Sequence, residues 1–232
     1  MTDRLISLLS LIIVLLAFTT GVFAHPFAYV ANSGDDTVSV IDTATNMVTG
    51  PPIAVGVSPV NIAITPDGTR AYVANLESYD VSVIDTATNM VVGAPIPVGD
   101  DPFGIAITPD GSRAYVANLG SDDVSVIDTA TNMVVGAPIP IGLRPQGIAI
   151  TPDGSRAYVV NINSNNVSVI NTATNMFVGA PITVGNNPQG IAITPDGTRA
   201  YVTNILTNNV SVINTATNMV VGAPIPVGTR PR

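Results

Sequence analysis

Paired carboxylates are the groups in this sequence whose type and spacing could do chemistry. Asp100-Asp101 and Asp122-Asp123 form two such pairs a short distance apart along the chain. Clustered carboxylates suit Ca²⁺, which takes about six to eight oxygen ligands. Asp100, Asp101, Asp122 and Asp123 are therefore candidate calcium ligands. The alternative is that they accept hydrogen bonds from backbone N–H groups in turns, because the sequence contains no calcium-loop motif.

Other reactive side chains are scarce. The chain has no Lys and no Cys, and the absence of Cys excludes disulfides, thiolate nucleophiles and Cys-based zinc sites. Its single His, His25, also argues against a Ser-His-Asp triad and against a His-rich zinc site. The net charge is −8 and the isoelectric point is about 4.2. A surplus of negative charge disfavours nucleic acids and anionic membrane surfaces as partners. A protein or a carbohydrate remains as the expected partner, and no cofactor other than calcium is indicated.

The first residues read as a signal peptide over 1–24. Arg4 supplies a positive start, an apolar run follows from Leu5 to Phe18, and Val22-Phe23-Ala24 resembles a cleavage site. A membrane anchor is the alternative, but this run is shorter than the roughly 20 apolar residues that span a bilayer. We therefore predict an exported protein, in the periplasm, on the cell surface or outside the cell, with no stable membrane span after cleavage.

A 43-residue repeat organises the rest of the chain. Its third copy reads GIAITPDG, SRAYVAN, DVSVIDTATN and MVVGAPIPVG over residues 104–142, which gives four strand candidates. Pro109-Asp110-Gly111 has the residues of a tight hairpin, and Asp128 can accept N–H bonds in the TATN turn that follows it. Counted from the Ala that precedes each repeated Tyr, the five copies begin at Ala28, Ala71, Ala114, Ala157 and Ala200.

Four short strands at this period predict an all-β fold, a β-propeller of four-stranded blades over residues 25–232. Bulky and small residues alternate within each strand, so both faces of each blade are expected to pack against neighbouring blades. Residues 28–57 supply three strands of a first blade without its inner strand, and four complete blades follow. The ring is then not closed by an interlocking strand. We expect a partial propeller, with closure by packing alone or by a second copy as the alternatives.

Tyr29-Val-Ala-Asn32, Tyr72-Val-Ala-Asn75 and Tyr201-Val-Thr-Asn204, each followed by VSVI(D/N)TATN, resemble the YVTN-type β-propeller repeats of exported and surface-layer proteins. The fourth copy departs slightly, because it carries Val160 at the third position of the motif. The resemblance covers residues 28–232 and implies a propeller outside the cytoplasm. It carries over no catalytic residue.

Differences between the copies are concentrated in two segments, the one after Tyr-Val-x-Asn and the one after the outer strand. Propeller topology places both on one side, so this side is the candidate ligand-binding face, although drift of solvated loops would give the same variation. We expect a non-catalytic binding or cell-surface structural module. The alternative is a lactonase-like hydrolase that uses a divalent cation. The candidate face comprises Asp35, Asp36, Glu77, Tyr79, Asp80, Asp100, Asp101, Phe103, Asp122, Asp123, Arg144 and Gln146.

Two further repeated residue types have structural interpretations. One Met begins each outer strand, as Met133 does in the third copy, and we expect it to pack. Arg113 and its equivalents precede the Tyr strand and are expected to lie opposite Asp128 and its equivalents.

Overall fold

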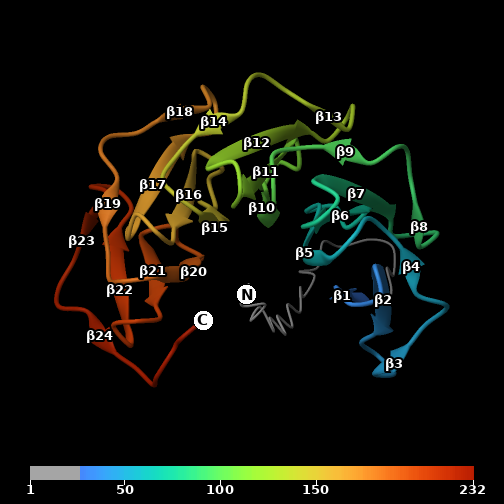
Figure 1. Cartoon of the computed structure of the whole chain (residues 1–232), viewed down its shortest axis with the longest axis horizontal. Helices are drawn as coiled ribbons and strands as arrows, with labels where there is room; N and C mark the ends of the chain where they lie inside the picture. Colours follow the sequence, from blue (N-terminus) through green and yellow to red (C-terminus); the bar gives the residue numbers. More distant parts are fainter. Residues whose placement is uncertain (1–26) are drawn as a thin grey trace, which may run out of the picture.

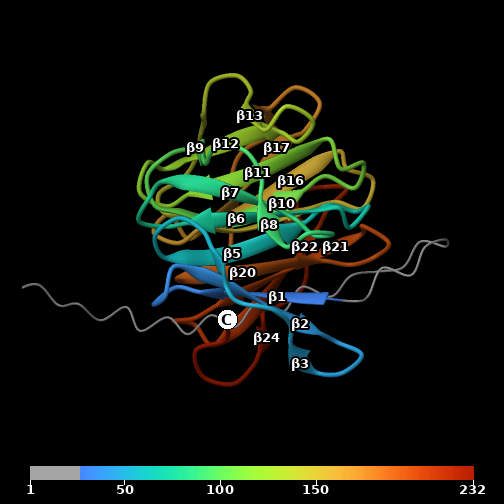
Figure 2. The ribbon, with the colours of Figure 1, turned by 90° about the vertical axis from the view of Figure 1, so that its right-hand side faces the viewer.

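A computed structural model describes residues 27–232, which form five antiparallel β-sheets arranged side by side in an open arc (Figure 1). Seen from the side, the strands of successive sheets lie as stacked layers (Figure 2). The predicted signal peptide falls outside the described residues. Among residues 27–232, no helix is long and apolar enough to cross a membrane.

Each sheet is one blade. Blade 1 contains β1 (Phe27–Asn32), β2 (Thr37–Asp42), β3 (Met47–Val48) and β4 (Ile53–Ala54). Blade 2 contains β5 (Pro59–Ile64), β6 (Arg70–Asn75), β7 (Asp80–Asp85), β8 (Met90–Val91) and β9 (Ile96–Pro97). Blade 3 contains β10 (Pro102–Ile107), β11 (Arg113–Asn118), β12 (Asp123–Asp128), β13 (Met133–Val134) and β14 (Ile139–Pro140). Blade 4 contains β15 (Pro145–Ile150), β16 (Arg156–Asn161), β17 (Asn166–Asn171), β18 (Met176–Phe177) and β19 (Ile182–Thr183). Blade 5 contains β20 (Pro188–Ile193), β21 (Arg199–Asn204), β22 (Asn209–Asn214), β23 (Met219–Val220) and β24 (Ile225–Pro226).

The outer strand differs from the sequence-based prediction. Instead of one strand over 133–142, two short strands, β13 and β14, both pair with β12. Gly136 between them has a φ of 74°, a left-handed conformation that few other residues adopt, and Pro138 lacks the N–H needed for pairing. The outer strand of every blade is therefore split in two.

The two repeated turns have the structural role that their sequences predict. In the PDG hairpin, the Gly111 N–H donates to the Thr108 carbonyl oxygen at 2.8 Å, and the Asp110 carboxylate accepts from the Ser112 N–H at 3.0 Å. In the TATN turn, the Asp128 carboxylate accepts from the Thr131 N–H at 2.9 Å. Side-chain acceptors of this kind satisfy N–H groups that the strands leave unpaired.

The core lies between blades rather than within them. Blade 2 presents a face built from Tyr and three branched aliphatic residues, and blade 3 covers it with a face built from Ala, Val and Ile. The Tyr72 hydroxyl also crosses this junction and donates to Asn132 Oδ1 at 2.7 Å. We call the first the tyrosine face and the second the alanine face. In this junction they comprise Tyr72, Val81, Val83 and Ile96, and Ala114, Val116 and Ile127, respectively.

The same junction recurs between each pair of consecutive blades in the described chain. The remaining three tyrosine–asparagine hydrogen bonds, each 2.7 Å, are Tyr29–Asn89, Tyr115–Asn175 and Tyr158–Asn218. Burial raises the pKa of the Tyr29 hydroxyl to about 12, and the nearby Asp85 charge adds to the increase. The tyrosine faces pack on the alanine faces at these junctions, which confirms the predicted packing of bulky side chains on small ones.

The ends of the arc are also as predicted. Blade 1 has β1 as its innermost strand, whereas β5, β10, β15 and β20 line the centre in the other blades (Figure 1). A gap separates blade 1 from blade 5 in the same view. The Tyr201 side chain of blade 5 is consequently 40% exposed, while its equivalents in the other blades are buried.

The repeated arginines lie where the sequence predicts, and the repeated methionines do not. Arg113 and Asp128 are direct cross-strand neighbours, as expected. The methionines do not pack as expected. Met133 is 64% exposed, because the short strand that carries it pairs at the rim and no further strand covers it. Its four equivalents are also exposed.

Candidate binding face

In blades 2 to 5, the two variable segments touch one another. In blade 3, the Leu119 N–H donates to the Asp101 carbonyl oxygen and the Gly120 N–H to the Asp100 carbonyl oxygen, both at 2.9 Å. These bonds join the connection after the Tyr strand to the connection that enters the inner strand. We call the surface that they form the loop face. It comprises residues 33–36, 76–79, 119–122, 162–165 and 205–208, and 56–58, 99–101, 142–144, 185–187 and 228–230.

One loop position fixes the path of the chain between blades. The fourth residue of each loop has a positive φ, for example 58° at Asp122. The Asp122 carboxylate accepts from the Arg144 N–H at 2.7 Å, and this bond links blade 3 to the segment that enters blade 4. Asp and Asn suit the position, because they tolerate left-handed backbone and carry a short acceptor. The equivalent contacts are Asp36–Ser58, Asn165–Asn187 and Asn208–Arg230.

Tyr79 occupies this position in blade 2 and breaks the pattern. Its φ is 58°, yet it has no short acceptor side chain for the N–H of Asp101, the residue that corresponds to Arg144. A left-handed conformation is uncommon and strained for a bulky residue. The Tyr79 side chain is 46% exposed. The loop face therefore carries an aromatic ring where local backbone chemistry favours Asp or Asn.

The carboxylates around Tyr79 are partly exposed. Glu77 and Asp100 are exposed, and Asp80 and Asp101 are half-buried. Asp80 accepts from Asn75 Nδ2 at 2.6 Å. The surroundings of the ring are thus anionic and rich in hydrogen-bond acceptors.

Two of the four candidate calcium ligands accept hydrogen bonds within the protein. Asp122 accepts the backbone bond described above, and Asp123 Oδ1 accepts from Asn118 Nδ2 at 2.6 Å. Within residues 27–232, no three His, Cys, Asp or Glu side chains gather in a way that could hold a metal ion. The structure therefore does not bring Asp100, Asp101, Asp122 and Asp123 together around one ion, and calcium binding stays a prediction.

Two residues of the predicted face are buried. Phe103 is 8% exposed and packs with Leu119 and Ile162, and Gln146 is 7% exposed. Both follow the proline that begins an inner strand, where neighbouring inner strands lie against one another. They help to build the face from beneath and are not available on its surface. Asp35 and Arg144 are exposed, and Asp36 is half-buried.

Sequence reasoning missed three exposed apolar side chains of the loop face. Val57 is 44% exposed, Leu143 is 54% exposed and Leu206 is 67% exposed. Val57 and Leu143 stand where the other copies carry Asp, Asn or Thr, and Leu206 stands where they carry Gly, Glu or Asn. This contrast could have identified them.

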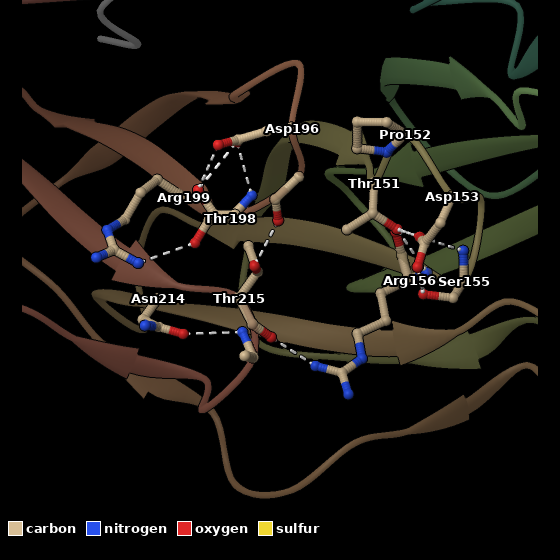
Figure 3. Close-up of a pocket in the computed structure, with 12 residues that line it drawn as sticks. Thr151, Pro152, Asp153, Ser155, Arg156, Asp196, Thr198, Arg199, Asn214 and Thr215 are labelled. Atoms are coloured by element: carbon tan, nitrogen blue, oxygen red, sulfur yellow. Dashed lines mark hydrogen bonds between the residues drawn. The ribbon is translucent and has the colours of Figure 1, made fainter.

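The opposite surface carries pockets between adjacent blades. The pocket between blades 4 and 5 measures about 490 Å³ and is shown in Figure 3. Its polar groups are engaged internally, because Asp153 accepts from Thr151 and Ser155, and Arg156 donates to the Thr215 carbonyl oxygen at 2.7 Å. Equivalent pockets of about 340 and 530 Å³ lie between blades 3 and 4 and between blades 2 and 3. Because equivalent pockets recur at three junctions, we interpret them as part of the seam where adjacent blades meet.

Comparison with solved structures supports the architecture. Hydrazine synthase from Kuenenia stuttgartiensis is similar with a TM-score of 0.64 and 24% identity, covering 88% of this chain and 84% of that one. A protein of unknown function from Desulfotomaculum acetoxidans gives a TM-score of 0.79 and 23% identity over 88% of this chain and 67% of the other. The dihydro-haem d1 dehydrogenase NirN gives 0.72 and 19%, over 88% of this chain and 44% of that one.

The chain has a β-propeller fold. No family model matches it, and no curated protein does either, so the resemblance to YVTN-type repeats stays a prediction. The likeness at these identities concerns the fold alone, since propellers carry many unrelated functions.

Proposed function

We propose that this propeller is an exported, non-catalytic binding or cell-surface structural module that recognises a protein or a carbohydrate through its loop face. Export rests on the signal-peptide pattern of residues 1–24. The observation that supports binding most directly is Tyr79, an exposed aromatic side chain held in a left-handed conformation. Strained residues that persist at a surface are often functional.

The chemistry around Tyr79 suits such partners. An aromatic ring offers apolar contact area at low cost in side-chain entropy, and tyrosine is common at binding surfaces. The neighbouring Glu77 and Asp100 are exposed acceptors, which can bind sugar hydroxyls or basic side chains. The loops that carry these groups are held by backbone hydrogen bonds, so little ordering is needed when a partner binds.

The centre of the propeller gives no support to catalysis. The inner strands read PVNIAI, PFGIAI, PQGIAI and PQGIAI and contain no titratable side chain. General acid–base or metal-assisted hydrolysis needs such groups close together. The lactonase-like alternative would therefore depend on loop-face carboxylates.

Binding can be tested on a panel of glycans and of basic and acidic peptides with the purified chain. Tyr79→Asn should reduce binding to the best probe by at least about tenfold, as expected for loss of an aromatic anchor. The matched control is Met133→Asn, which removes an apolar side chain at the rim that is even more exposed than Tyr79. If both variants bind like the parent, the loop face is not the recognition surface.

The same preparation separates binding from catalysis. Lactone hydrolysis should stay at the buffer rate with and without added Ca²⁺. Turnover that disappears in Asp100→Asn and Asp101→Asn variants would contradict the non-catalytic proposal and support the hydrolase.

A further inference from the structure

The outer strands of the blades form a rim that carries no charge. We call the rim the outer segments of the five blades, residues 47–55, 90–98, 133–141, 176–184 and 219–227, which contain no Asp, Glu, Lys, Arg or His. The net charge of the chain is −8, and in the described chain the charged side chains all lie outside these segments. The rim is therefore an uncharged surface on an acidic protein.

One groove in the rim can receive side chains. It lies between blades 3 and 4, measures about 540 Å³ and is lined by residues 135–140 and 174–177. Strands β14 and β18, which contribute to its two sides, lie next to each other on the outside of the arc (Figure 1). Pro138 and Pro140 are exposed on one side, and Met176 is 67% exposed on the other. We call this feature the rim groove.

Phe177 distinguishes the rim groove from the rest of the rim. It is 48% exposed, and the other four copies carry Val at its position. Those residues are Val48, Val91, Val134 and Val220. Exposed aromatic side chains of this kind often act as anchors in protein interfaces. The patch therefore combines a hollow with a large apolar side chain at its border.

The edge of blade 3 is not suited to the addition of another strand. Gly136 has a φ of 74°, which interrupts the extended backbone, and Pro138 and Pro140 have no N–H to donate. A partner would therefore contact the rim groove through side chains and would not extend the sheet.

We propose that the rim groove is a self-association site, in which Phe177 of each of two copies of the chain enters the groove of the other. This arrangement has twofold symmetry, the commonest symmetry of soluble oligomers, and requires a patch that complements itself. A groove with an exposed aromatic ring at its border meets this requirement. The contact lies away from the loop face, so it does not depend on what that face binds.

Charge and size favour a second copy as the occupant. Two chains of net charge −8 repel one another, and contact through the rim places no charged side chain in the interface. The outer segments of blades 3 and 4 supply about 18 residues, close to the roughly 20–30 that each partner contributes to a stable interface. A flat lipid surface would touch only a small part of the rim, because the rim curves around the arc (Figure 1).

Sedimentation velocity of the purified protein, over about 1 to 100 µM, tests the proposal. The chain should form a reversible dimer in this range. Phe177→Asp should weaken dimerisation by at least about tenfold, because it removes the anchor and places two like charges in the contact. Phe177→Val, which restores the residue of the other copies, should also weaken dimerisation.

The matched control is Val91→Asp, which places the same charge at the equivalent exposed position of blade 2. It should dimerise like the parent. Circular dichroism melting should show that all three variants stay folded, because both altered side chains are exposed. Raising the salt concentration from about 0.05 to 0.5 M should not weaken the dimer, since screening reduces repulsion between acidic chains.

A chain that stays monomeric up to about 100 µM would overturn the proposal. A dimer that Phe177→Asp leaves intact, or that Val91→Asp dissociates equally, would also overturn it, because the contact would then lie elsewhere or extend over the whole rim. If the chain is monomeric and binds phosphatidylcholine vesicles in a manner that Phe177→Asp abolishes, the groove binds lipid and not a second copy.

Discussion

Tyr79 illustrates how a single residue can depart from the repeat without disturbing the fold. Its backbone keeps the left-handed φ of the loop position, and the Val98 N–H still donates to its carbonyl oxygen at 3.0 Å. What changes is the side chain, which exchanges a structural acceptor for an exposed ring. If the ring binds a partner as proposed, stability and recognition are set against one another at this position, as is common at functional sites.

Replacing Tyr79 by Asn should stabilise the protein by about 1 kcal/mol. Asn accepts the left-handed conformation at lower cost and can take a hydrogen bond from the Asp101 N–H, as Asn165 does from the Asn187 N–H. Urea unfolding monitored by circular dichroism measures the change. Asn165→Tyr, the reverse substitution in blade 4, should destabilise by a similar amount. A destabilised Tyr79→Asn variant would show that the ring is held by contacts that outweigh the strain.

Among residues, the sequence indicates the candidate face but not its surface composition. Comparison of the copies identified the loops that vary, and most of the residues named there are exposed or half-buried. Phe103 and Gln146 were placed on the surface because they vary, yet they are buried. Variation alone does not report solvent exposure, because apolar packing at the foot of the loops also changes from blade to blade.

The PDG hairpin is the element on which each complete blade depends. The hydroxyl of Thr151 donates to the Asp153 carboxylate at 2.6 Å, and the Ser155 N–H donates at 3.0 Å. These bonds lower the pKa of Asp153, the Thr151 bond most of all. The same cause lowers the pKa of Asp67, Asp110 and Asp196.

Acid should therefore weaken the hairpins. A carboxyl group whose pKa is lower in the folded chain stabilises the fold above its unfolded pKa of about 3.9, and this contribution is lost as the pH falls through the folded pKa. We expect a constant melting temperature between about pH 5 and 8 and a decline below about pH 4. Asp153→Asn should lower the neutral-pH midpoint by roughly 2–4 °C and reduce the acid decline. Asp35→Asn, in an exposed loop, is the matched control; an equal loss there would deny the hairpin a special role.

The sequence predicts the turns correctly but not the form of the outer strand, and the difference has a physical reason. Hairpins and TATN turns follow from residues with strong local preferences, such as Gly111 and Asp128, and they appear as expected. The split outer strand was not foreseen, although Gly136 and Pro138 carry the signal. The bulky aliphatic residues favour a continuous strand. Gly136 and Pro138 nevertheless interrupt it, because an edge strand pairs on one side only and has few hydrogen bonds to hold it straight.

Seen as a whole, the molecule is held by seams between blades. Each seam combines apolar burial with a tyrosine hydroxyl that donates across the junction. Burial raises the pKa of Tyr29, Tyr72, Tyr115 and Tyr158. The fold class and the incomplete first blade followed from the repeat length, whereas the cross-blade bonds link residues far apart in sequence and could not be predicted.

Alkali should loosen the seams. A tyrosine with a raised pKa in the folded chain contributes stability that is complete below its unfolded pKa of about 10 and is lost as the pH rises through the folded value. For Tyr29 that value is about 12, so we expect the unfolding free energy to fall between pH 10 and 12. Denaturant titrations across this range measure the slope. Tyr29→Phe should make the slope shallower, and an unchanged slope would contradict a role for the Tyr29 hydroxyl.

The tyrosine bond always reaches 60 residues forward, from one blade to the next. During synthesis, a blade can therefore complete its contacts only after the following blade has left the ribosome. We expect the blades to become ordered one after another in the direction of translation, because each newly made blade completes the contacts of the blade before it. The junctions between blades should therefore form in the order in which the blades are synthesised.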